Sequence, residues 1–501
     1  MKITINMSAT LMERINTHHL APGKRFESLS YVWARVVHSP TGSIRVVIPH
    51  NAPVLFFAPD CFISQSAGNV RLAPEVLNGM LVKFAASSFN CLVNVHDHWF
   101  DAHTRFSNAD DRDDLEFDQY LRRSFEPMLV KHPHIGQARA IYNLSIVLAQ
   151  KACDARLIDS RESSPFQPVN TINLIGGHFG HLNTSRKELQ QMNKEMFNRQ
   201  VDFIPADKQD LLTDINVALV GCGGLGSILA EDLGRAGFGE VDLFDDDKLE
   251  LSNLNRWQGG MPGDVGKFKA DLLAERMRRM FPHMRVKAYA RSIYAERIEQ
   301  AIAFNDIIVA GLDNDEARFF LNRLSLQYSI PYFDSGVAIT GCVDTTDFRS
   351  RYFAVLPGVT ACTECTGFKL YDKEQVRDAS ADEATARSRR AAGYVMDQPQ
   401  VTSPSVYFVN QRASSLLVQE LLNYVCGWRA TATTILESWR NGVFQRADRD
   451  NFPETPDPEC PVCSYYAGAA DVEPLPRPRP FLKQVPINLF SKPHTQEVHH
   501  G

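Results

Sequence analysis

The spacing of hydrophobic and polar residues predicts strands and a helix in the first part of the chain. Residues 30–39 (SYVWARVVHS) and 43–49 (SIRVVIP) alternate as half-buried strands do, and residues 72–89 have the spacing of an amphipathic helix. A short apolar run at residues 91–96 (CLVNVH) predicts a further strand. These elements indicate a small mixed α/β domain over about the first 180 residues.

A change of composition predicts where this domain ends. Residues 156–183 are rich in Ser, Pro, Asn and Gly, and we expect the last strand of the domain at residues 170–175 (NTINLI), with the boundary just after it. A helix is expected from Thr184 to about Arg199. From residue 215 the order strand, glycine turn, helix, strand repeats, which is typical of a parallel sheet covered by helices. The expected organisation is α/β throughout, with domains at 1–180 and 181–470 and a proline-rich tail at 471–501.

Charge and hydropathy narrow the class of protein. The 501 residues carry a formal net charge of -6 and contain no basic block. The chain therefore lacks the concentrated positive charge with which proteins bind nucleic acids or membrane surfaces. No run approaches the roughly 18 apolar residues of a membrane span, and the N-terminus lacks the pattern of a cleaved secretion signal. We therefore expect a cytoplasmic protein that binds neither nucleic acid nor membrane.

A glycine-rich turn predicts a nucleotide site. Gly221, Gly223, Gly224 and Gly226 stand between an apolar strand and a helix, where backbone N–H groups and the helix N-terminus attract phosphate. Asp245 ends the next strand, where a carboxylate can hold ribose hydroxyls. Taken alone, these residues allow the NAD site of a dehydrogenase as well as an ATP site.

Polar residues further along favour ATP. They follow two strands and comprise Asn253, Arg256, Lys269, Asp313 and Asn314. Attack of a carboxylate on the α-phosphate of ATP builds negative charge on phosphorus and on the departing pyrophosphate, which calls for Arg and Lys donors and a carboxylate that holds Mg²⁺. Hydride transfer needs no such cluster, so the residues indicate adenylation.

These motifs resemble the ThiF/MoeB/HesA family and the adenylation domain of ubiquitin-activating enzymes over about residues 185–470. The shared motifs are G-x-G-G-x-G, the D-x-D of Asp245 and Asp247, S-N-L-x-R, D-V-G-x-x-K and D-N-x-x-x-R. The resemblance implies ribose binding by Asp245, phosphate contacts by Asn253, Arg256 and Lys269, and Mg²⁺ binding by Asp313. It also implies a homodimer in which Arg199, in the sequence MFNRQ, reaches the ATP of the partner subunit.

Two C-x-x-C pairs predict a structural metal. They are Cys362 with Cys365 and Cys460 with Cys463, and each pair can supply two thiolates on one tight turn. Together the four sulfurs make a tetrahedral Zn²⁺ site. Unrelated buried thiols and a redox pair are the alternatives, although two copies are better explained by one metal. The resembling family carries paired C-x-x-C motifs in corresponding places.

The segment after the first pair lacks a nucleophile. Many ubiquitin activators carry there a cysteine that takes over the activated carboxylate as a thioester, but residues 366–405 contain no cysteine. Met396 stands near where some relatives have Cys, and Cys426 lies in an apolar stretch that predicts a core helix. We therefore expect adenylation followed by transfer to a partner's thiol or to a sulfur carrier.

The sequence HDHW at residues 96–99 suggests a second metal. His96 and His98 project to one side of a strand, so they can chelate one Zn²⁺ while a carboxylate and water complete the shell. The stretch resembles the JAB/JAMM metallo-isopeptidase motif, H-x-H-P followed by S-x-x-D, with Ser107 and Asp110 at the latter positions. The resemblance implies that Glu27, on an early strand, moves the proton of the attacking water and that Ser107 helps to hold the oxyanion.

The match to this second motif is incomplete. Trp99 replaces the usual proline, the gap to Ser107 is one residue longer, and Asp111 competes with Asp110 as the carboxylate ligand. His103 is expected to be a bystander. A degenerate domain without metal and a plain polar loop remain the alternatives.

The two domains together predict both release and activation of the C-terminus of a ubiquitin-like protein that ends in glycine. One domain would trim a precursor or cleave conjugates, and the other would activate the freed carboxylate with ATP. Such fusions resemble those of bacterial ubiquitin-like modification systems, which also supply a conjugating enzyme. Two alternatives are activation of a sulfur carrier for thiocarboxylate formation with a sulfur donor, and a non-catalytic domain that only binds a ubiquitin-like protein.

Overall fold

The computed structural model describes the greater part of the chain. The described residues are 2–66, 70–101, 104–131, 140–183, 194–295, 297–340, 347–366, 405–440, 442–447 and 453–472. They belong to one compact unit, Met1–Phe368 with Pro404–Leu475. The second unit, Lys369–Ser403 with Pro476–Gly501, lies outside the described residues, and so do Met396 and all of the expected tail beyond residue 472.

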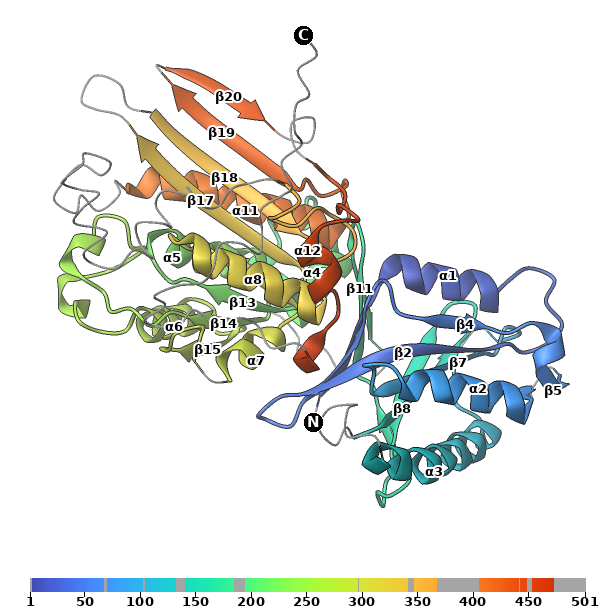
Figure 1. The fold of residues 1–501 in the computed structure, drawn as a ribbon. Coiled ribbons are helices and arrows are strands. Elements are labelled where there is room, and N and C mark those ends of the chain that lie inside the picture. The colour runs from blue at the N-terminus through green and yellow to red at the C-terminus, as the bar shows by residue number, and fades with distance from the viewer. Residues whose placement is uncertain are drawn as a thin grey trace, which may run out of the picture. The chain divides into compact units, whose positions relative to one another are not determined.

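A mixed ten-stranded sheet forms the N-terminal part (Figure 1). Its strands are β1 (Ile3–Ser8), β2 (Leu29–His38), β3 (Ile44–Ile48), β4 (Val54–Phe56), β7 (Cys91–Asp97), β8 (Tyr142–Leu148), β9 (Cys153–Ile158), β10 (Phe166–Pro168), β11 (Thr171–Ile175) and β12 (Phe179–Asn183). They follow the order β10-β9-β8-β7-β2-β3-β1-β11-β12, with β4 paired to β2. A separate hairpin consists of β5 (Phe62–Gln65) and β6 (Val70–Leu72).

Helices cover both faces of this sheet because its strands are apolar on both sides. Val32 and Ala34 of β2 belong to the core that includes residues of α1 (Ala9–His19). Tyr31 and Trp33, which point the other way, belong to the core with α2 (Pro74–Ala85) and α3 (Asn108–Lys131). Figure 1 shows α1 on one side of the sheet and α2 and α3 on the other.

The first sheet has one strand more after residue 175 than the sequence predicts. The expected strand at residues 170–175 is β11, but it is not the last, because β12 pairs antiparallel with it and Ile175 faces Phe179. The short connection at Gly176 and Gly177 turns the chain back instead of ending the domain. Of the helix expected at 184–199, residues 184–193 lie outside the described residues, and its end is the 3-10 turn η2 (Lys194–Phe197).

A second sheet has eight strands, in the order β15-β14-β13-β16-β17-β18-β19-β20. They are β13 (Asn216–Val220), β14 (Glu240–Phe244), β15 (Arg285–Tyr289), β16 (Ile307–Ala310), β17 (Tyr332–Thr340), β18 (Asp347–Val355), β19 (Thr434–Arg440) and β20 (Val443–Ala447). The expected parallel arrangement holds for β13 to β17, whereas β17 to β20 are antiparallel.

The parallel strands are buried on both faces, which explains their continuous apolar runs. Val217 and Leu219 of β13 face one core, and Ala218 and Val220 face the other.

The helices of this part of the chain are α4 (Ala206–Asp214), α5 (Gly224–Ala236), α6 (Lys269–Met280), α7 (Ile298–Ala303), α8 (Asp315–Tyr328), α11 (Tyr407–Cys426) and α12 (Pro461–Tyr466). Short 3-10 turns are η1 (Pro59–Cys61), η3 (Leu251–Asn253), η4 (Pro262–Asp264) and η6 (Ala470–Val472). Cys426 lies in α11 and is buried in the core, as the sequence predicts. None of the helices within the described ranges is long and apolar enough to cross a membrane.

Candidate functional site

Three parallel strands of the second sheet end at one edge. Val220 of β13 is in register with Phe244 of β14 and with Ala310 of β16. Gly221 and Asp245, the next residues along two of these strands, therefore lie side by side. Ligands of open parallel sheets bind beyond the carboxyl ends of the strands, so this edge is the first candidate site.

The glycine turn has the close backbone approach that phosphate binding requires. Gly221 has φ +88°, and a Cβ atom there would lie 2.9 Å from the carbonyl oxygen of Gly311. A Cβ atom on Gly226 would lie 1.8 Å from the carbonyl oxygen of Gly221. Only glycine fits both positions. Helix α5 begins at Gly224, so its first backbone N–H groups, which no carbonyl of the helix accepts, are at this edge.

Asp245 is fixed beside the glycine turn by the backbone. Its Oδ2 accepts the N–H of Cys222 at 2.6 Å, and its Oδ1 accepts the N–H of Asp247 at 2.8 Å. Burial raises the pKa of Asp245. Asp245, Asp246 and Asp247 each offer a carboxylate oxygen within 4.8 Å of the others, which is a group able to hold a cation. Asp313, expected to bind Mg²⁺, is exposed and is not in this group.

Arg256 and Lys269 lie at the same edge. The Trp257 indole donates a 2.7 Å hydrogen bond to the carbonyl of Cys222, which holds the segment with Arg256 against the glycine turn. A Cβ atom on Gly224 would lie 3.0 Å from Cγ of Arg256. Lys269 is the first residue of α6, and its Nζ lies 2.7 Å from Oδ2 of Asp247. The structure thus brings both cations to the turn, and Trp257 is an anchor that sequence reasoning missed.

Two expected ligands have local structural roles. The side-chain oxygen of Asn314 accepts the N–H of Ala317 at 2.8 Å and caps α8. The side-chain oxygen of Asn253 accepts the N–H of Glu250 at 3.2 Å. Helix capping by Asn ahead of acidic residues is a common sequence signal, so the role of Asn314 could have been found from DNDEAR.

Arg199 lies away from the glycine turn of its own chain. The neighbouring Gln200 donates to the carbonyl of Ala236, at the end of α5 opposite the turn, at 3.3 Å. Because α5 has 13 residues, its two ends are separated by about 18 Å.

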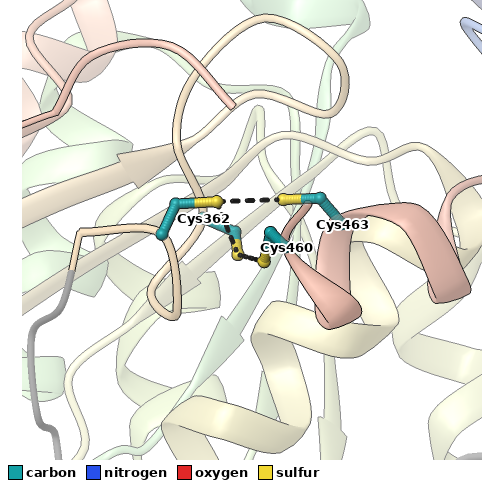
Figure 2. A group of neighbouring side chains, drawn as sticks. Cys362, Cys460 and Cys463 are labelled. Atoms are coloured by element: carbon teal, nitrogen blue, oxygen red, sulfur yellow. Dashed lines mark hydrogen bonds between the residues drawn. The ribbon is translucent and has the colours of Figure 1, made fainter. Parts of the chain in front are cut away.

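The four cysteines of the C-x-x-C pairs converge, and Figure 2 labels Cys362, Cys460 and Cys463 among them. Sulfur–sulfur distances are 3.7 Å for Cys362 and Cys365, 3.8 Å for Cys362 and Cys460, and 3.4 Å for Cys365 and Cys463. A tetrahedron of sulfurs bound to Zn²⁺ at 2.3 Å has edges of about 3.8 Å. The arrangement fits a Cys₄ zinc site, which would join the loop after β18 to the start of α12.

A second group of metal-binding side chains lies at the end of β7. Glu27, His96, His98 and Asp110 each offer one ligand atom, and these atoms lie within 4.8 Å of one another. Nε2 of His96 is 3.4 Å from Oδ1 of Asp110, and Nε2 of His98 is 3.6 Å from Oδ2 of the same carboxylate. Nε2 of His98 also lies 3.9 Å from Oε1 of Glu27.

Local sequence explains how α3 positions the carboxylate. Ser107 precedes the helix, and its Oγ accepts the N–H of Asp110 at 3.2 Å, while Asp110 accepts the N–H of Ser107 at 2.5 Å. S-x-x-D is therefore also the start signal of α3. Asp111, the competing candidate, accepts a hydrogen bond from Arg156 at 2.5 Å, so the carboxylate facing the histidines is Asp110. His103 lies outside the described residues.

The electrostatics of this group suit a divalent cation. Nε2 of His96 is buried and has no hydrogen-bond partner among the described residues. Burial acts to raise the pKa of Asp110, but the neighbouring His96 and Ser107 outweigh it and lower that pKa. Burial raises the pKa of Glu27 to about 7. Two imidazoles and a carboxylate are the ligand types of catalytic zinc sites, and Glu27 is poised for proton transfer near neutral pH.

Glu27 is not within a strand, which corrects the sequence expectation. It lies two residues before β2, in the loop after α1. The hairpin of β5 and β6 holds its backbone: Glu27 N–H donates to the carbonyl of Ser66 at 2.9 Å, and Gln65 donates to the carbonyl of Glu27 at 2.9 Å. A loop position cannot be recognised from alternation because the apolar pattern begins only at Leu29.

Comparisons with known proteins match the second sheet. The profile of the ThiF family matches residues 197–462, more than half of the chain. The NEDD8-activating enzyme E1 catalytic subunit of Arabidopsis thaliana is 34% identical over 171 residues, covering 33% of this chain and 37% of that protein. The sulfur carrier protein ThiS adenylyltransferase of Bacillus subtilis (strain 168) is 33% identical over 192 residues, covering 38% of this chain and 54% of that protein. The chain thus spans less than two thirds of the length of either relative.

Solved structures show a weaker likeness. The crystal structure of E. coli MccB with ATP aligns at 20% identity over 55% of this chain and 76% of that chain, with a TM-score of 0.42. A likeness at this level supports no conclusion about activity.

Proposed function

Because the chain belongs to the ThiF family, we propose that it uses ATP to adenylate the C-terminal carboxylate of a ubiquitin-like protein or sulfur carrier. The observation that carries the proposal is the convergence of the glycine turn, Asp245, Arg256 and Lys269 on one sheet edge. The names of the relatives, a NEDD8-activating subunit and a ThiS adenylyltransferase, support the substrate class.

Each group at this edge has a role that follows from its chemistry. The N-terminus of α5 and the glycine turn would bind phosphate, and Asp245 would bind the ribose hydroxyls. A carboxylate oxygen of the partner attacks the α-phosphorus of ATP, a new P–O bond forms, and pyrophosphate leaves with the electron pair of the broken bond. Arg256 and Lys269 would stabilise the charge that builds on these oxygens. Mg²⁺ held by Asp313 or by the acidic group at Asp245 would neutralise part of the phosphate charge.

Partner-dependent ATP–pyrophosphate exchange tests this function. The full-length protein should exchange labelled pyrophosphate into ATP only when a ubiquitin-like protein ending in Gly-Gly is present. The same partner without its terminal glycines should support no exchange. Exchange without any partner, or none with several Gly-Gly-ending partners, would contradict adenylation of this carboxylate.

We also propose that the N-terminal sheet carries a zinc-dependent peptidase of JAB type. The supporting observation is the grouping of Glu27, His96, His98 and Asp110, in which the buried Nε2 of His96 has no hydrogen-bond partner among the described residues. Zn²⁺ bound by the two histidines and Asp110 would supply a Lewis acid for amide hydrolysis. Glu27 would take a proton from the attacking water and return it to the leaving amine, and Ser107 would help to hold the oxyanion.

This peptidase would either trim a precursor or release a conjugate. In both reactions water adds to the carbonyl carbon of the terminal glycine, the C–N bond breaks, and a carboxylate and an amine result. That carboxylate is the group that the adenylation site would activate, so one chain would both release the C-terminus and adenylate it. Incubation with a ubiquitin-like protein extended beyond Gly-Gly should give the mature C-terminus, and an unchanged precursor would favour the non-catalytic binding domain instead.

The compound that forms from the acyl adenylate distinguishes a conjugation pathway from a sulfur-transfer pathway. Residues 366–405 contain no cysteine, which favours transfer to a partner: a conjugating enzyme in a bacterial ubiquitin-like pathway, or a sulfur donor in cofactor biosynthesis. Mass spectrometry of the carrier after reaction should find a thioester with a conjugating enzyme in the first case and a C-terminal thiocarboxylate in the second.

We further propose that the protein acts as a homodimer. Arg199 sits beside the end of α5 that is remote from the glycine turn, so it cannot serve the phosphates of its own chain. Placed across a two-fold axis, it could reach the ATP of the partner subunit.

A further inference from the structure

A buried polar group lies directly behind the proposed peptidase site. Asp97 is the last residue of β7 and stands between His96 and His98, so its side chain points to the opposite face of the sheet. It is 0% exposed. Its Oδ2 lies 2.8 Å from Nδ1 of His19 and 2.5 Å from Nζ of Lys24, and it accepts the N–H of Ser28 at 3.0 Å.

The group has the connectivity of a hydrolase triad, but it cannot act as one. Nε2 of His19 lies 2.8 Å from Oγ of Ser30. Because the Asp97 carboxylate only accepts, His19 carries its proton on Nδ1 and accepts from the Ser30 hydroxyl through Nε2. His19, Ser30 and Asp97 are all 0% exposed, so no substrate can reach the hydroxyl. The group can affect a reaction only through the residues that it holds.

Those residues lie before and after Glu27 in the sequence. Lys24 and Ser28 flank Glu27 in the loop between α1 and β2, and both bind the same oxygen of Asp97. Lys24 Nζ also donates to the carbonyl of His19 at 2.7 Å, which ties the loop to the end of α1. One carboxylate therefore fixes the segment that carries Glu27 to the strand end that carries both histidines.

A buried charge pair is an expensive way to achieve stability alone. Lys24 and Asp97 have side chains that are 12% and 0% exposed, and apolar residues of similar volume would often be at least as stabilising. A charged and directional contact does fix one geometry, however. Here that geometry is the 3.9 Å approach of Glu27 Oε1 to Nε2 of His98.

We propose that Asp97, with Lys24 and His19, is a positioning group that sets the placement of Glu27 relative to the metal-binding histidines. The proposal rests on the proposed peptidase function of this site. Asp97 touches neither substrate nor metal and acts through Glu27. Its replacement should therefore lower turnover and leave metal and substrate binding in place.

The kinetic test is a double-mutant cycle in the full-length protein. Asp97→Asn keeps the size of the side chain and removes its charge, and it should lower kcat for precursor cleavage by about 10- to 100-fold, the range for residues that orient a metal site, with KM and zinc content unchanged. In a Glu27→Gln background the same change should have no further effect on the residual rate. An additive loss, or a loss of zinc, would mean that Asp97 supports the fold of the site in general and would overturn the proposal.

A matched control is available in the same domain. Asp118 is also 0% exposed and accepts from one cation and one backbone N–H, those of Arg122 at 2.7 Å and Ser160 at 2.8 Å. Asp118→Asn should lower thermal stability while leaving kcat unchanged. If Asp97→Asn does not fold, Lys24→Ala and Lys24→Arg replace it, because Arg keeps the charge and should retain more of kcat than Ala. Equal loss of kcat in Asp97→Asn and Asp118→Asn would overturn the proposal.

Hydrogen exchange provides a readout that needs no activity. Residues 20–28 should exchange faster in Asp97→Asn than in the unaltered protein, while β7 stays protected. Unchanged exchange in this segment would overturn the anchoring role. If the unaltered protein cleaves no precursor but the segment is released in the variant, the peptidase function fails and the anchoring of Glu27 stands.

Discussion

Nζ of Lys269 lies 2.7 Å from Oδ2 of Asp247, at the edge where the glycine turn begins. The carboxylate is 69% exposed whereas the lysine is 12% exposed. An ion pair with an exposed partner contributes little free energy. In the proposed reaction, phosphate oxygens would therefore replace Asp247 as the partner of Lys269 without a large penalty.

Lys269→Ala should lower partner-dependent pyrophosphate exchange by at least about 100-fold, the usual effect of removing one donor that stabilises transition-state charge. The matched control is Lys267→Ala, since Lys267 is 56% exposed and pairs with Asp264 three residues away in sequence. Exchange should remain normal in the control. A similar loss in both variants would point to a general effect on the loop, and normal exchange in Lys269→Ala would refute the assigned role.

The cysteine group predicts a metal that is separate from catalysis. Cys460→Ser should remove one zinc ion per chain and lower the melting temperature by several degrees, because the site joins the loop after β18 to α12. Cys426→Ser is the control, since Cys426 is also buried but lies in α11 and is not in the group. Zinc is measured by elemental analysis and stability by calorimetry. Equal zinc in both variants would show that the four sulfurs hold no metal.

Sequence patterns predict the second sheet well because its parallel strands are short, apolar and separated by glycine turns. Gly221 and Gly226 could be identified because no other residue fits a turn of this kind. The antiparallel extension through β18 to β20 was not foreseen, since its central pairing, of β18 with β19, joins residues as distant in sequence as Phe353 and Thr434. β12 was missed for a different reason: it pairs with β11 across a short turn, and the glycine-rich sequence of that turn was interpreted as the domain boundary.

The histidine site was predictable in part. His96 and His98 are recognisable from strand alternation, and Ser107 and Asp110 from the start signal of α3. The choice between Asp110 and Asp111 could not be made from the sequence, because it depends on Arg156, which lies on β9 and takes Asp111 as its partner. Tertiary ion pairs of this kind leave no local pattern.

The histidine group predicts that the two proposed activities are separable. His96→Ala should abolish precursor cleavage and remove one of two zinc ions per chain, since His96 belongs to one of the two candidate metal groups with His or Cys ligands among the described residues. It should leave pyrophosphate exchange unchanged. His38→Ala is the control, because His38 is an exposed histidine at the far end of β2 that contacts Tyr142. Loss of both activities in His96→Ala would require one shared site instead of two.

Arg199 gives a test of both the homodimer and the sharing of sites between subunits. Arg199→Ala and Lys269→Ala homodimers should each be inactive in pyrophosphate exchange, because every site lacks one of the two residues. If Arg199 serves the partner subunit, a mixed dimer has one site that lacks both residues and one intact site. Random mixing makes half of the dimers mixed, so exchange should recover to about a quarter of the unaltered level.

The alternative arrangement predicts a different result from the same mixture. If Arg199 served its own chain, every site in the mixed dimer would lack one residue and exchange would stay absent. Lys208→Ala is a matched control for Arg199→Ala, since Lys208 lies on α4 next to Gln209, which donates to the carbonyl of Ala236 at the same end of α5. Lys208→Ala should be active by itself, and native mass spectrometry of the mixed Arg199→Ala and Lys269→Ala chains, whose masses differ, measures how far the chains exchange. A lack of recovery in the mixture despite proven chain exchange would contradict action across the subunits.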